Sequence, residues 1–207
     1  MSHYPVTTEY PWGSAEPMNT AAYLTAPIIA VCRELSARRI LDLGCGNGAL
    51  CAELARAGFA VEGCDPSQQG VAVARAAHPQ IRFHLLGVYD DPQALGATDF
   101  DVVVSTEVIP LLYHPRALPR FAARVLRPGG HLIVTTPYHG YWKNLALALA
   151  GQWDRHFAAS SDYGFVKFWS RATLTRLLTE EGFVVTRFSG AGRLPYLWKS
   201  MILVGRR

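Results

Sequence analysis

Apolar residues follow two alternating patterns along this chain. Short runs of branched and aromatic residues predict buried strands, and the clearest is FDVVVS at 100–105, whose valines need burial on both faces of a sheet. Between these runs lie segments of helical spacing, several of which end at a glycine such as Gly58 or Gly182. The predicted strands are 39–43, 59–64, 81–86, 100–105, 131–135, 183–188 and 201–204, and the predicted helices are 49–57, 67–77, 116–126 and 170–181.

Strands that alternate with helices predict an α/β fold, in which a mainly parallel sheet carries helices on both faces. Right-handed crossovers then place the functional loops at the carboxyl ends of the strands. The sequence RPGG at 127–130 predicts a sharp turn. We expect a single domain over 1–207 with two additions, an N-terminal cap at 1–36 and an aromatic-rich insert at 137–169 that we interpret as a substrate lid.

The N-terminal cap contains one segment with a helical pattern. Residues 23–35 are mostly apolar on one face, and Pro27 would begin or bend such a helix. A helix in this place can cover a bound ligand and exclude water, so we interpret it as a second lid.

Composition narrows the class of protein. Of the 207 residues, 50% are hydrophobic and 17% are charged, which is typical of a globular domain. No run approaches the roughly 20 apolar residues of a membrane span, and the N-terminus lacks the pattern of a signal peptide, so we expect a cytoplasmic protein. The four cysteines form no CxxC pair, which favours buried, reduced thiols over a disulfide framework or a zinc site.

The net charge of +4 does not by itself indicate which kind of molecule the protein binds. The basic residues are scattered, without the basic and aromatic strip of a nucleic-acid surface. An acidic small molecule is equally compatible with the charge. We therefore expect a small-molecule partner and disfavour a nucleic acid or a membrane, and we expect a monomer or a homodimer.

A glycine-rich motif, DLGCGNG at 42–48, follows a predicted strand and opens a predicted helix. Gly44 and Gly46 allow a tight turn and a close approach to a ligand. The spacing D-x-G-x-G-x-G differs from the dinucleotide motif G-x-G-x-x-G, which disfavours a nicotinamide oxidoreductase. A pyrophosphate would avoid the carboxylate of Asp42, whereas the cationic end of S-adenosylmethionine suits it. The motif therefore predicts S-adenosylmethionine as cofactor and S-adenosylhomocysteine as product.

Further residues extend this cofactor site. Asp65 closes the second strand 19 residues after Gly46, where a carboxylate can accept both ribose hydroxyls. Val88 and Tyr89 can offer backbone groups to adenine, and Asp90 can accept from its exocyclic amine. The predicted cofactor-binding set also contains three neighbours within these motifs, Cys45, Pro66 and Thr106.

Four segments resemble the motifs of the class I methyltransferases, in the expected order over 38–136. They are ILDLGCGNGAL, VEGCDPS, FDVVVSTEVI and LRPGGHLIVTTP. Three more, PYHGYWKNLALA, KFWSRATL and GRLPYLWKSMIL, look like a bacterial branch of the group around the ubiquinone-biosynthesis O-methyltransferases. The resemblance implies a Rossmann-like sheet of seven strands whose last is antiparallel. It also implies cofactor roles for Asp42, Gly44, Gly46, Asp65 and Asp90.

One position departs from the quinone subgroup, which has E-x-x-E-H after the fourth strand. Here the run is Glu107-Val-Ile-Pro110-Leu111, so the Glu-His pair is replaced. We therefore expect no metal. Glu107 stays a candidate catalytic residue, with a solvated or helix-capping residue as the alternative.

We expect the residues that bind the methyl acceptor in the two segments outside the core, 1–36 and 137–169. His139 is the first candidate for a general base and His156 the second, with Asp154 as a partner that can orient it. A loop histidine bonded to backbone is the alternative for His139. The predicted substrate-binding set consists of rings that can stack on a planar acceptor and cations that can pair with an acidic group. It contains Tyr10, Trp12, Tyr23, Tyr138, Trp142, Lys167 and Arg193.

These patterns predict in-line transfer of a methyl group to a hydroxyl on a small planar or aromatic acceptor. N-methylation of a small molecule and a module that binds S-adenosylmethionine without catalysis are alternatives. A nucleic-acid methyltransferase is disfavoured, because the run after the fourth strand is Ser-Thr-Glu-Val at 105–108 instead of Asn/Asp-Pro-Pro-aromatic.

Overall fold

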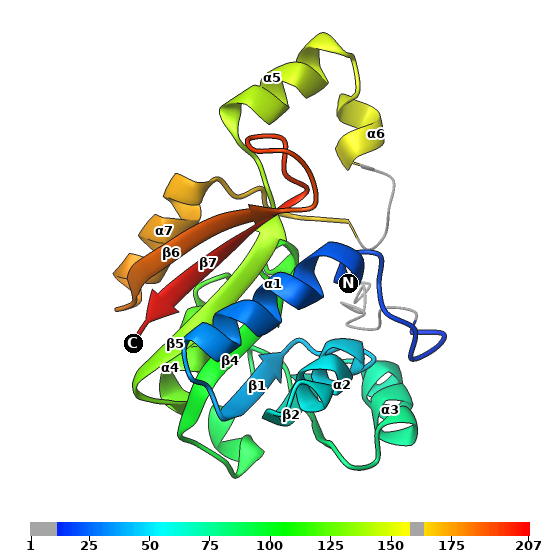
Figure 1. The fold of residues 1–207 in the computed structure, drawn as a ribbon, viewed down its shortest axis with the longest axis vertical. Helices are drawn as coiled ribbons and strands as arrows, with labels where there is room; N and C mark the ends of the chain where they lie inside the picture. The colour runs from blue at the N-terminus through cyan, green and yellow to red at the C-terminus, as the bar shows by residue number, and fades with distance from the viewer. Residues whose placement is uncertain (1–11, 158–163) are drawn as a thin grey trace, which may run out of the picture.

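The structure is a computed structural model and describes residues 12–157 and 164–207. Seven strands form one sheet in the order β3-β2-β1-β4-β5-β7-β6 (Figure 1). They are β1 Arg39–Leu43, β2 Ala60–Asp65, β3 Arg82–Leu85, β4 Phe100–Thr106, β5 Leu126–Pro137, β6 Val184–Ala191 and β7 Ser200–Arg206. The α-helices are α1 Ala21–Glu34, α2 Ala49–Arg56, α3 Gln68–Ala77, α4 Ala117–Val125, α5 Tyr141–Leu149, α6 Trp153–Phe157 and α7 Arg171–Glu180, and 3₁₀ turns occupy η1 Pro92–Leu95 and η2 Ile109–Leu111.

Strand β7 runs antiparallel to both of its neighbours, β5 and β6, whereas the other strand pairs are parallel. The predicted α/β fold with seven strands and an antiparallel last strand is therefore confirmed. No helix in the described part of the chain is long and apolar enough to cross a lipid bilayer.

The predicted turn at 127–130 was wrong. These residues lie inside β5, which is continuous from Leu126 to Pro137. Leu126 pairs with Phe100 and His131 pairs with Val102, so the segment between them forms an irregularity in the strand. The glycines that indicated a turn lie in this irregular segment of β5. Gly129 adopts a φ of +74° there, which a glycine tolerates without strain.

The two faces of the sheet bury two different sets of side chains, because neighbouring residues of a strand point to opposite faces. Val103 packs in one cluster with the buried residues of α4 and α7. Val102 and Val104 pack in the other cluster, which includes the buried side chains of α1 and Leu54 of α2. This double burial explains why β4 is apolar at successive positions.

Helix α1 belongs to the core, and its role as a lid over the ligand stays a prediction. Its buried residues Leu24, Ile28, Val31 and Cys32 pack on the sheet with strand residues such as Ile133. At roughly 25 cal/mol per Å² of buried apolar surface, lifting such a face would cost several kcal/mol. The helix therefore covers one face of the sheet permanently.

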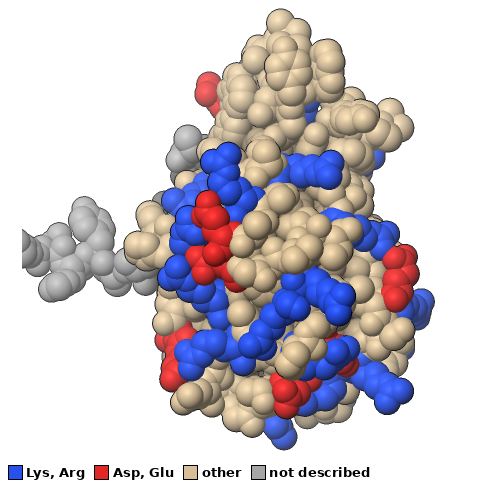
Figure 2. Space-filling view, turned by 90° about the vertical axis from the view of Figure 1, so that its left-hand side faces the viewer, with Lys and Arg blue, Asp and Glu red and all other residues tan. Residues whose placement is uncertain are grey.

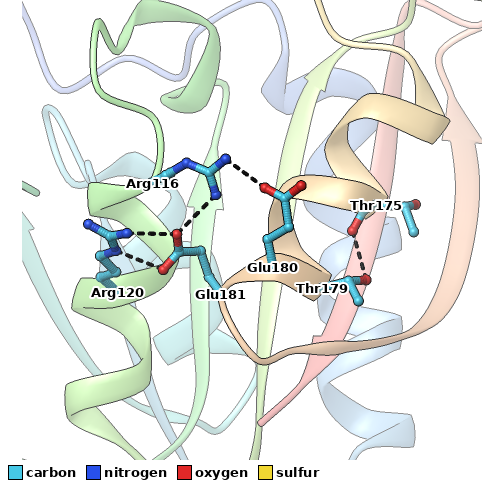
Figure 3. Close-up of polar contacts among 6 residues, drawn as sticks. All are labelled: Arg116, Arg120, Thr175, Thr179, Glu180 and Glu181. Carbon is cyan, nitrogen blue, oxygen red and sulfur yellow. Dashed lines mark hydrogen bonds and ion pairs between the residues drawn. The ribbon is translucent and has the colours of Figure 1, made fainter.

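A group of ion pairs joins α4 to the end of α7 (Figure 3). Arg120 donates to both carboxylate oxygens of Glu181, at 2.7 and 3.0 Å. Arg116 bridges Glu181 and Glu180, at 3.1 and 2.6 Å. The side chain of Glu181 is only 10% exposed, against 44% for Glu180. The bidentate contact with Arg120 lowers the pKa of Glu181.

We expect Glu181→Gln to lower the melting temperature at neutral pH by about 2 °C, since it removes the bidentate ion pair. The pKa of Glu181 is lower in the folded protein, so its contribution exists above the ordinary value of 4.5 and is lost as the pH falls below it. Thermal unfolding at pH 7 and pH 3 measures both effects. Glu180→Gln is the matched control and should change less; equal losses in both variants would contradict the assignment.

Candidate active site

The loop between β1 and α2 is built around glycines in the left-handed region. Gly44 has a φ of +86° and Gly46 a φ of +53°, which other residues adopt only with strain. A Cβ atom at Gly44 would lie 2.3 Å from Cγ2 of Val108, which follows β4. A Cβ atom at Gly46 would lie 2.2 Å from the indole of Trp12. The loop thus lies directly against the end of β4 and the N-terminal segment.

Asp65, the last residue of β2, fixes this loop. Its Oδ2 accepts a hydrogen bond from the amide of Gly46 at 2.8 Å, and its Oδ1 accepts one from the amide of Ser67, also at 2.8 Å. Ser67 in turn caps α3 by accepting from the amide of Gly70 at 2.9 Å. The two oxygens of this carboxylate thus join the glycine loop to the start of α3.

Asp42 lies in the penultimate position of β1 and is only 1% exposed. Its Oδ2 accepts a hydrogen bond from Sγ of Cys51 at 3.3 Å, and its Oδ1 has no partner. Burial raises the pKa of Asp42 to about 7, despite the hydrogen bond from Cys51. The carboxylate is therefore held under the glycine loop in a poorly solvated place.

Unpaired polar atoms collect at one edge of the sheet. Among the described residues, the buried atoms without a hydrogen bond include Asp42 Oδ1, Thr106 Oγ1 and Thr136 Oγ1. These three residues stand at or next to the carboxyl ends of β1, β4 and β5. An unpaired buried polar group costs about 1–3 kcal/mol, so this edge is prepared for a polar ligand.

The other predicted cofactor residues surround the same edge. Val88 is buried in the core, and Tyr89 is 57% exposed, with its hydroxyl accepting from the amide of His114. Asp90 Oδ2 accepts from the amide of Gly87 at 2.7 Å. Two neighbours have packing roles. The buried thiol of Cys45 lies against Gly63, and Pro66 packs on Gly87.

Residues 12–16 cover the glycine loop. The side-chain amide of Asn47 donates to the carbonyl oxygens of Ser14 and Glu16, at 2.9 and 2.8 Å. The indole of Trp12 lies between Gly46 and Gly70. Trp12 was predicted to bind the acceptor, and in the structure it lies on the cofactor loop. Tyr10, predicted for the same role, lies outside the described residues.

Glu107 follows β4 and faces the other half of the edge. Its φ is +59°, a conformation that costs a residue other than glycine about 1–3 kcal/mol. Thr135 Oγ1 donates to Glu107 Oε1 at 2.9 Å, and the amide of Glu107 donates to Thr135 Oγ1 at 3.0 Å. Burial raises the pKa of Glu107 to about 7, opposed by hydrogen bonds from Thr135 and Ser200 and by the charge of Lys143.

A small polar cluster forms around Glu107. The hydroxyl of Tyr23 lies 3.2 Å from Ser200 Oγ, and Ser200 lowers the pKa of Glu107. Lys143 Nζ donates to the carbonyl oxygen of Tyr138 at 2.8 Å, and burial lowers the pKa of Lys143 to about 8. Sequence analysis missed Thr135, Lys143 and Ser200. Lys143 had a usable signal, because it is the single charged residue of the apolar helix α5.

His139 lies inside an aromatic cluster and is 8% exposed. Its ring stacks on Phe157 at 5.6 Å and contacts Phe168 edge-on at 5.0 Å, and the ring of His156 lies 5.6 Å away. Burial, followed by the charge of Lys143, lowers the pKa of His139 to about 4. The imidazole is therefore neutral at physiological pH and has mainly apolar neighbours.

The insert 137–169 folds partly into α5 and α6, which stand above the sheet in Figure 1. Tyr138 is buried against Phe188 and Trp198. Trp142 is 61% exposed. The backbone amide of Lys167 donates to the carbonyl oxygen of Pro110 at 3.0 Å.

The turn at the departure from E-x-x-E-H contacts the end of the insert through its backbone. Pro110 lies in η2 and also accepts from the amide of Val166 at 2.9 Å. The end of the insert is thus held by the turn in which the quinone subgroup has its Glu-His pair. Within the described residues, no group of three or more His, Cys, Asp or Glu side chains is arranged to hold a metal ion.

A cavity of about 820 Å³ lies between α5, α6 and the connection from β6 to β7. Its basic lining residues are Lys143, His156, Arg193 and Lys199. The residues of the glycine loop do not line it. The structure therefore separates a glycine-loop half of the edge from an open half beside Glu107.

The family model of the methyltransferase domain matches residues 20–187 of this chain. The chain belongs to the methyltransferase domain family. The family confirms the predicted resemblance and the predicted cofactor, S-adenosylmethionine.

Curated relatives agree with this methyltransferase domain. This chain is 32% identical over 168 residues to the ubiquinone biosynthesis O-methyltransferase of Bradyrhizobium sp. (strain ORS 278). The alignment covers 78% of this chain and 64% of that protein. The protein of the same name from Alkalilimnicola ehrlichii is 28% identical over 190 residues, covering 87% of this chain and 74% of that protein. The chain thus spans less than two thirds of the Bradyrhizobium protein.

Solved structures share the fold. The PH0226 protein from Pyrococcus horikoshii OT3 has a TM-score of 0.71 and 17% identity, with 95% of both chains covered. Magnesium protoporphyrin IX methyltransferase from Synechocystis PCC 6803 with bound SAH has a TM-score of 0.67 and 18% identity, covering 89% of this chain and 82% of that chain. The same enzyme is known with bound SAM.

The methyltransferase domain fits this cofactor at its glycine-loop half. The loop of Gly44 and Gly46 is held by Asp65, and among the described residues Asp42 Oδ1 has no hydrogen-bond partner. We expect Asp65→Ala to weaken S-adenosylhomocysteine binding about tenfold or more, because two loop amides lose their acceptor. Isothermal calorimetry measures the affinity. The control is Asp154→Ala, at an exposed carboxylate of α6; an affinity for Asp65→Ala within twofold of wild type would contradict the role.

The burial of the Asp42 carboxylate should lower the free energy of unfolding at neutral pH. Its pKa is raised on folding, so the native state loses stability as the pH rises from 3.8 towards 7. We expect Asp42→Asn to raise the melting temperature of the ligand-free domain at pH 8 and to have a smaller effect at pH 5. Thermal unfolding at both pH values checks this, with Asp154→Asn as a neutral control. A lower melting temperature for Asp42→Asn at pH 8 would exclude the burial penalty.

Proposed function

We propose that this domain transfers the methyl group of S-adenosylmethionine to a hydroxyl of a small planar acceptor, with Glu107 as general base. The observation that carries the proposal is the half-buried Glu107 carboxylate, next to Val108 and the glycine loop, with a pKa raised to about 7. A base with a pKa near the working pH is the most effective one for deprotonating a hydroxyl. The relatives named O-methyltransferases support oxygen as the nucleophile.

When bound, the cofactor supplies an activated methyl group, and the chain's own residues position the acceptor. Glu107 accepts the hydroxyl proton while the new bond to oxygen forms. Hydrogen bonds from Thr135 and Ser200 keep its carboxylate in one orientation. The charge of Lys143 favours the ionised form of Glu107, which is the form that can accept the proton. The insert 137–169, as a substrate lid, excludes water from this region.

The two histidines remain alternatives as bases. His156 lines the cavity, and its pKa is lowered mainly by burial. His139 has a pKa of about 4 and is stacked between rings, which makes it a weaker base than Glu107. We therefore favour Glu107 and assign His139 to the packing of the lid.

A small-molecule acceptor is favoured over a nucleic acid by the surface. In Figure 2, blue side chains cover more of this face than red ones, red side chains lie beside several of them, and the upper part around α5 is mostly uncharged. Several of the arginines are paired with carboxylates, as Arg127 is with Asp101. A basic side chain that is paired with a carboxylate attracts a phosphate less than an unpaired one does. We also propose the cytoplasm as the location, since all four cysteines are free and buried.

We expect Glu107→Gln to lower kcat by about 100-fold or more while leaving S-adenosylhomocysteine affinity within about twofold. In the wild type, kcat/KM should rise with pH and level off above about 7, where Glu107 is ionised, and this rise should disappear in the variant. Methyl transfer to a panel of catechols, followed by mass spectrometry, measures both. His139→Gln is the comparison variant and should retain the pH profile. A loss of the rise in His139→Gln but not in Glu107→Gln would assign the base to His139.

A further inference from the structure

The cavity between α5, α6 and the connection from β6 to β7 has an unusual charge balance. Its lining contains Lys143, Arg193, Lys199 and His156, and among the described residues no Asp or Glu side chain lines it. The rest of its wall is apolar, as at Leu147 and Leu194. Such a combination of a cationic group and an apolar wall is typical of a site for an amphipathic anion.

Arg193 and Lys199 form no ion pair within the part of the chain that the structure describes. In the described ranges 12–157 and 164–207, eight arginines form ion pairs, and Arg193 is not among them. Lys199 lies over the ring of Tyr23, with Nζ 5.1 Å from the centroid, and has no carboxylate partner among the described residues. Two cations at this cavity, Arg193 and Lys199, therefore have no carboxylate partner among the described residues.

The basic groups also repel one another. The charge of Arg193 lowers the pKa of Lys143, after the larger effect of burial. Lys143 and Arg193 both lower the pKa of His156, again after burial. Like charges held together in a partly desolvated place are unfavourable, and a bound anion would remove this repulsion.

The same cations lead directly to the proposed base. Lys143 acts on Glu107 through its charge. Lys199 contacts Tyr23, whose hydroxyl lies 3.2 Å from Ser200 Oγ, and Ser200 lowers the pKa of Glu107. A ligand whose acidic group lies on these cations can therefore direct another part of itself towards Glu107.

We propose that this cavity binds the acidic group of the methyl acceptor, so that the acceptor is a hydroxylated carboxylic acid with an apolar body. Arg193 and Lys199 bind the carboxylate, and the apolar wall of α5 and 194–197 contacts the body of the molecule. This inference rests on the proposed function, because it assigns the acceptor of the same reaction. It makes Arg193 a residue that determines specificity and does not itself touch the reacting atoms.

The test compares two probes that differ only in charge, 3,4-dihydroxycinnamate and its uncharged amide. Calorimetry measures their binding to the full chain saturated with S-adenosylhomocysteine, and mass spectrometry measures their methylation with S-adenosylmethionine. We expect the acid to bind about tenfold more tightly than the amide. Arg193→Gln should reduce this preference to about twofold, and Arg193→Glu should reverse it. Arg176→Gln, at an exposed arginine of α7, is the matched control and should keep the wild-type preference.

The outcomes separate the two proposals. Equal binding of acid and amide, binding of neither, or a preference that survives in Arg193→Gln would overturn the assignment of an acidic acceptor. A preference for the acid that depends on Arg193, without methyl transfer to either probe, would support the anion site and contradict the proposed reaction. Methylation of both probes at equal rates would support the reaction and reject the anion site.

Discussion

The carboxylate of Asp65 is the contact on which the active edge depends. It accepts hydrogen bonds from two amides at once, one in the glycine loop and one at the start of α3. Two loops that follow different strands are thereby fixed relative to each other. A loop rich in glycine has high conformational freedom, so without this anchor its ordering would be costly. The left-handed turns at Gly44 and Gly46 and the approach of Trp12 all follow from a loop held in this place.

The half of the site near the glycine loop could be predicted from sequence, and the half near Glu107 could be predicted only in part. Gly44, Gly46 and Asp65 are recognisable because a tight strand-to-helix turn dictates their type and spacing. The cluster around Glu107 is assembled from β4, β5, α5 and β7, and its members meet only through strand pairing and the packing of the insert. Thr135 and Ser200 are small polar residues in strands, and nothing in their local sequence distinguishes them. Trp12 and α1 are further examples of what sequence leaves open. Their apolar character predicts that they are buried, but it does not predict that Trp12 packs on the glycine loop or that α1 packs on the sheet.

Two carboxylates at this edge carry a cost in folding free energy. Asp42 and Glu107 both have a pKa raised by burial, and Glu107 also adopts a left-handed backbone conformation. Both features oppose folding, and the apolar clusters on the two faces of the sheet offset them. Asp42 lies near the end of β1 and Glu107 just after β4, where these strands leave the core. The edge of the sheet thus keeps groups of unusual reactivity.

The antiparallel direction of β7 has a consequence for how such a domain can change over time. Because β6 and β7 form a hairpin, their connection lies at the same edge as the loops after the parallel strands, and it carries both Arg193 and Lys199. A hairpin connection can gain or lose residues without altering the register of the strands that it joins. Selection for a different acceptor could thus act on residues 192–199 alone, while the glycine loop and Asp65 stay unchanged.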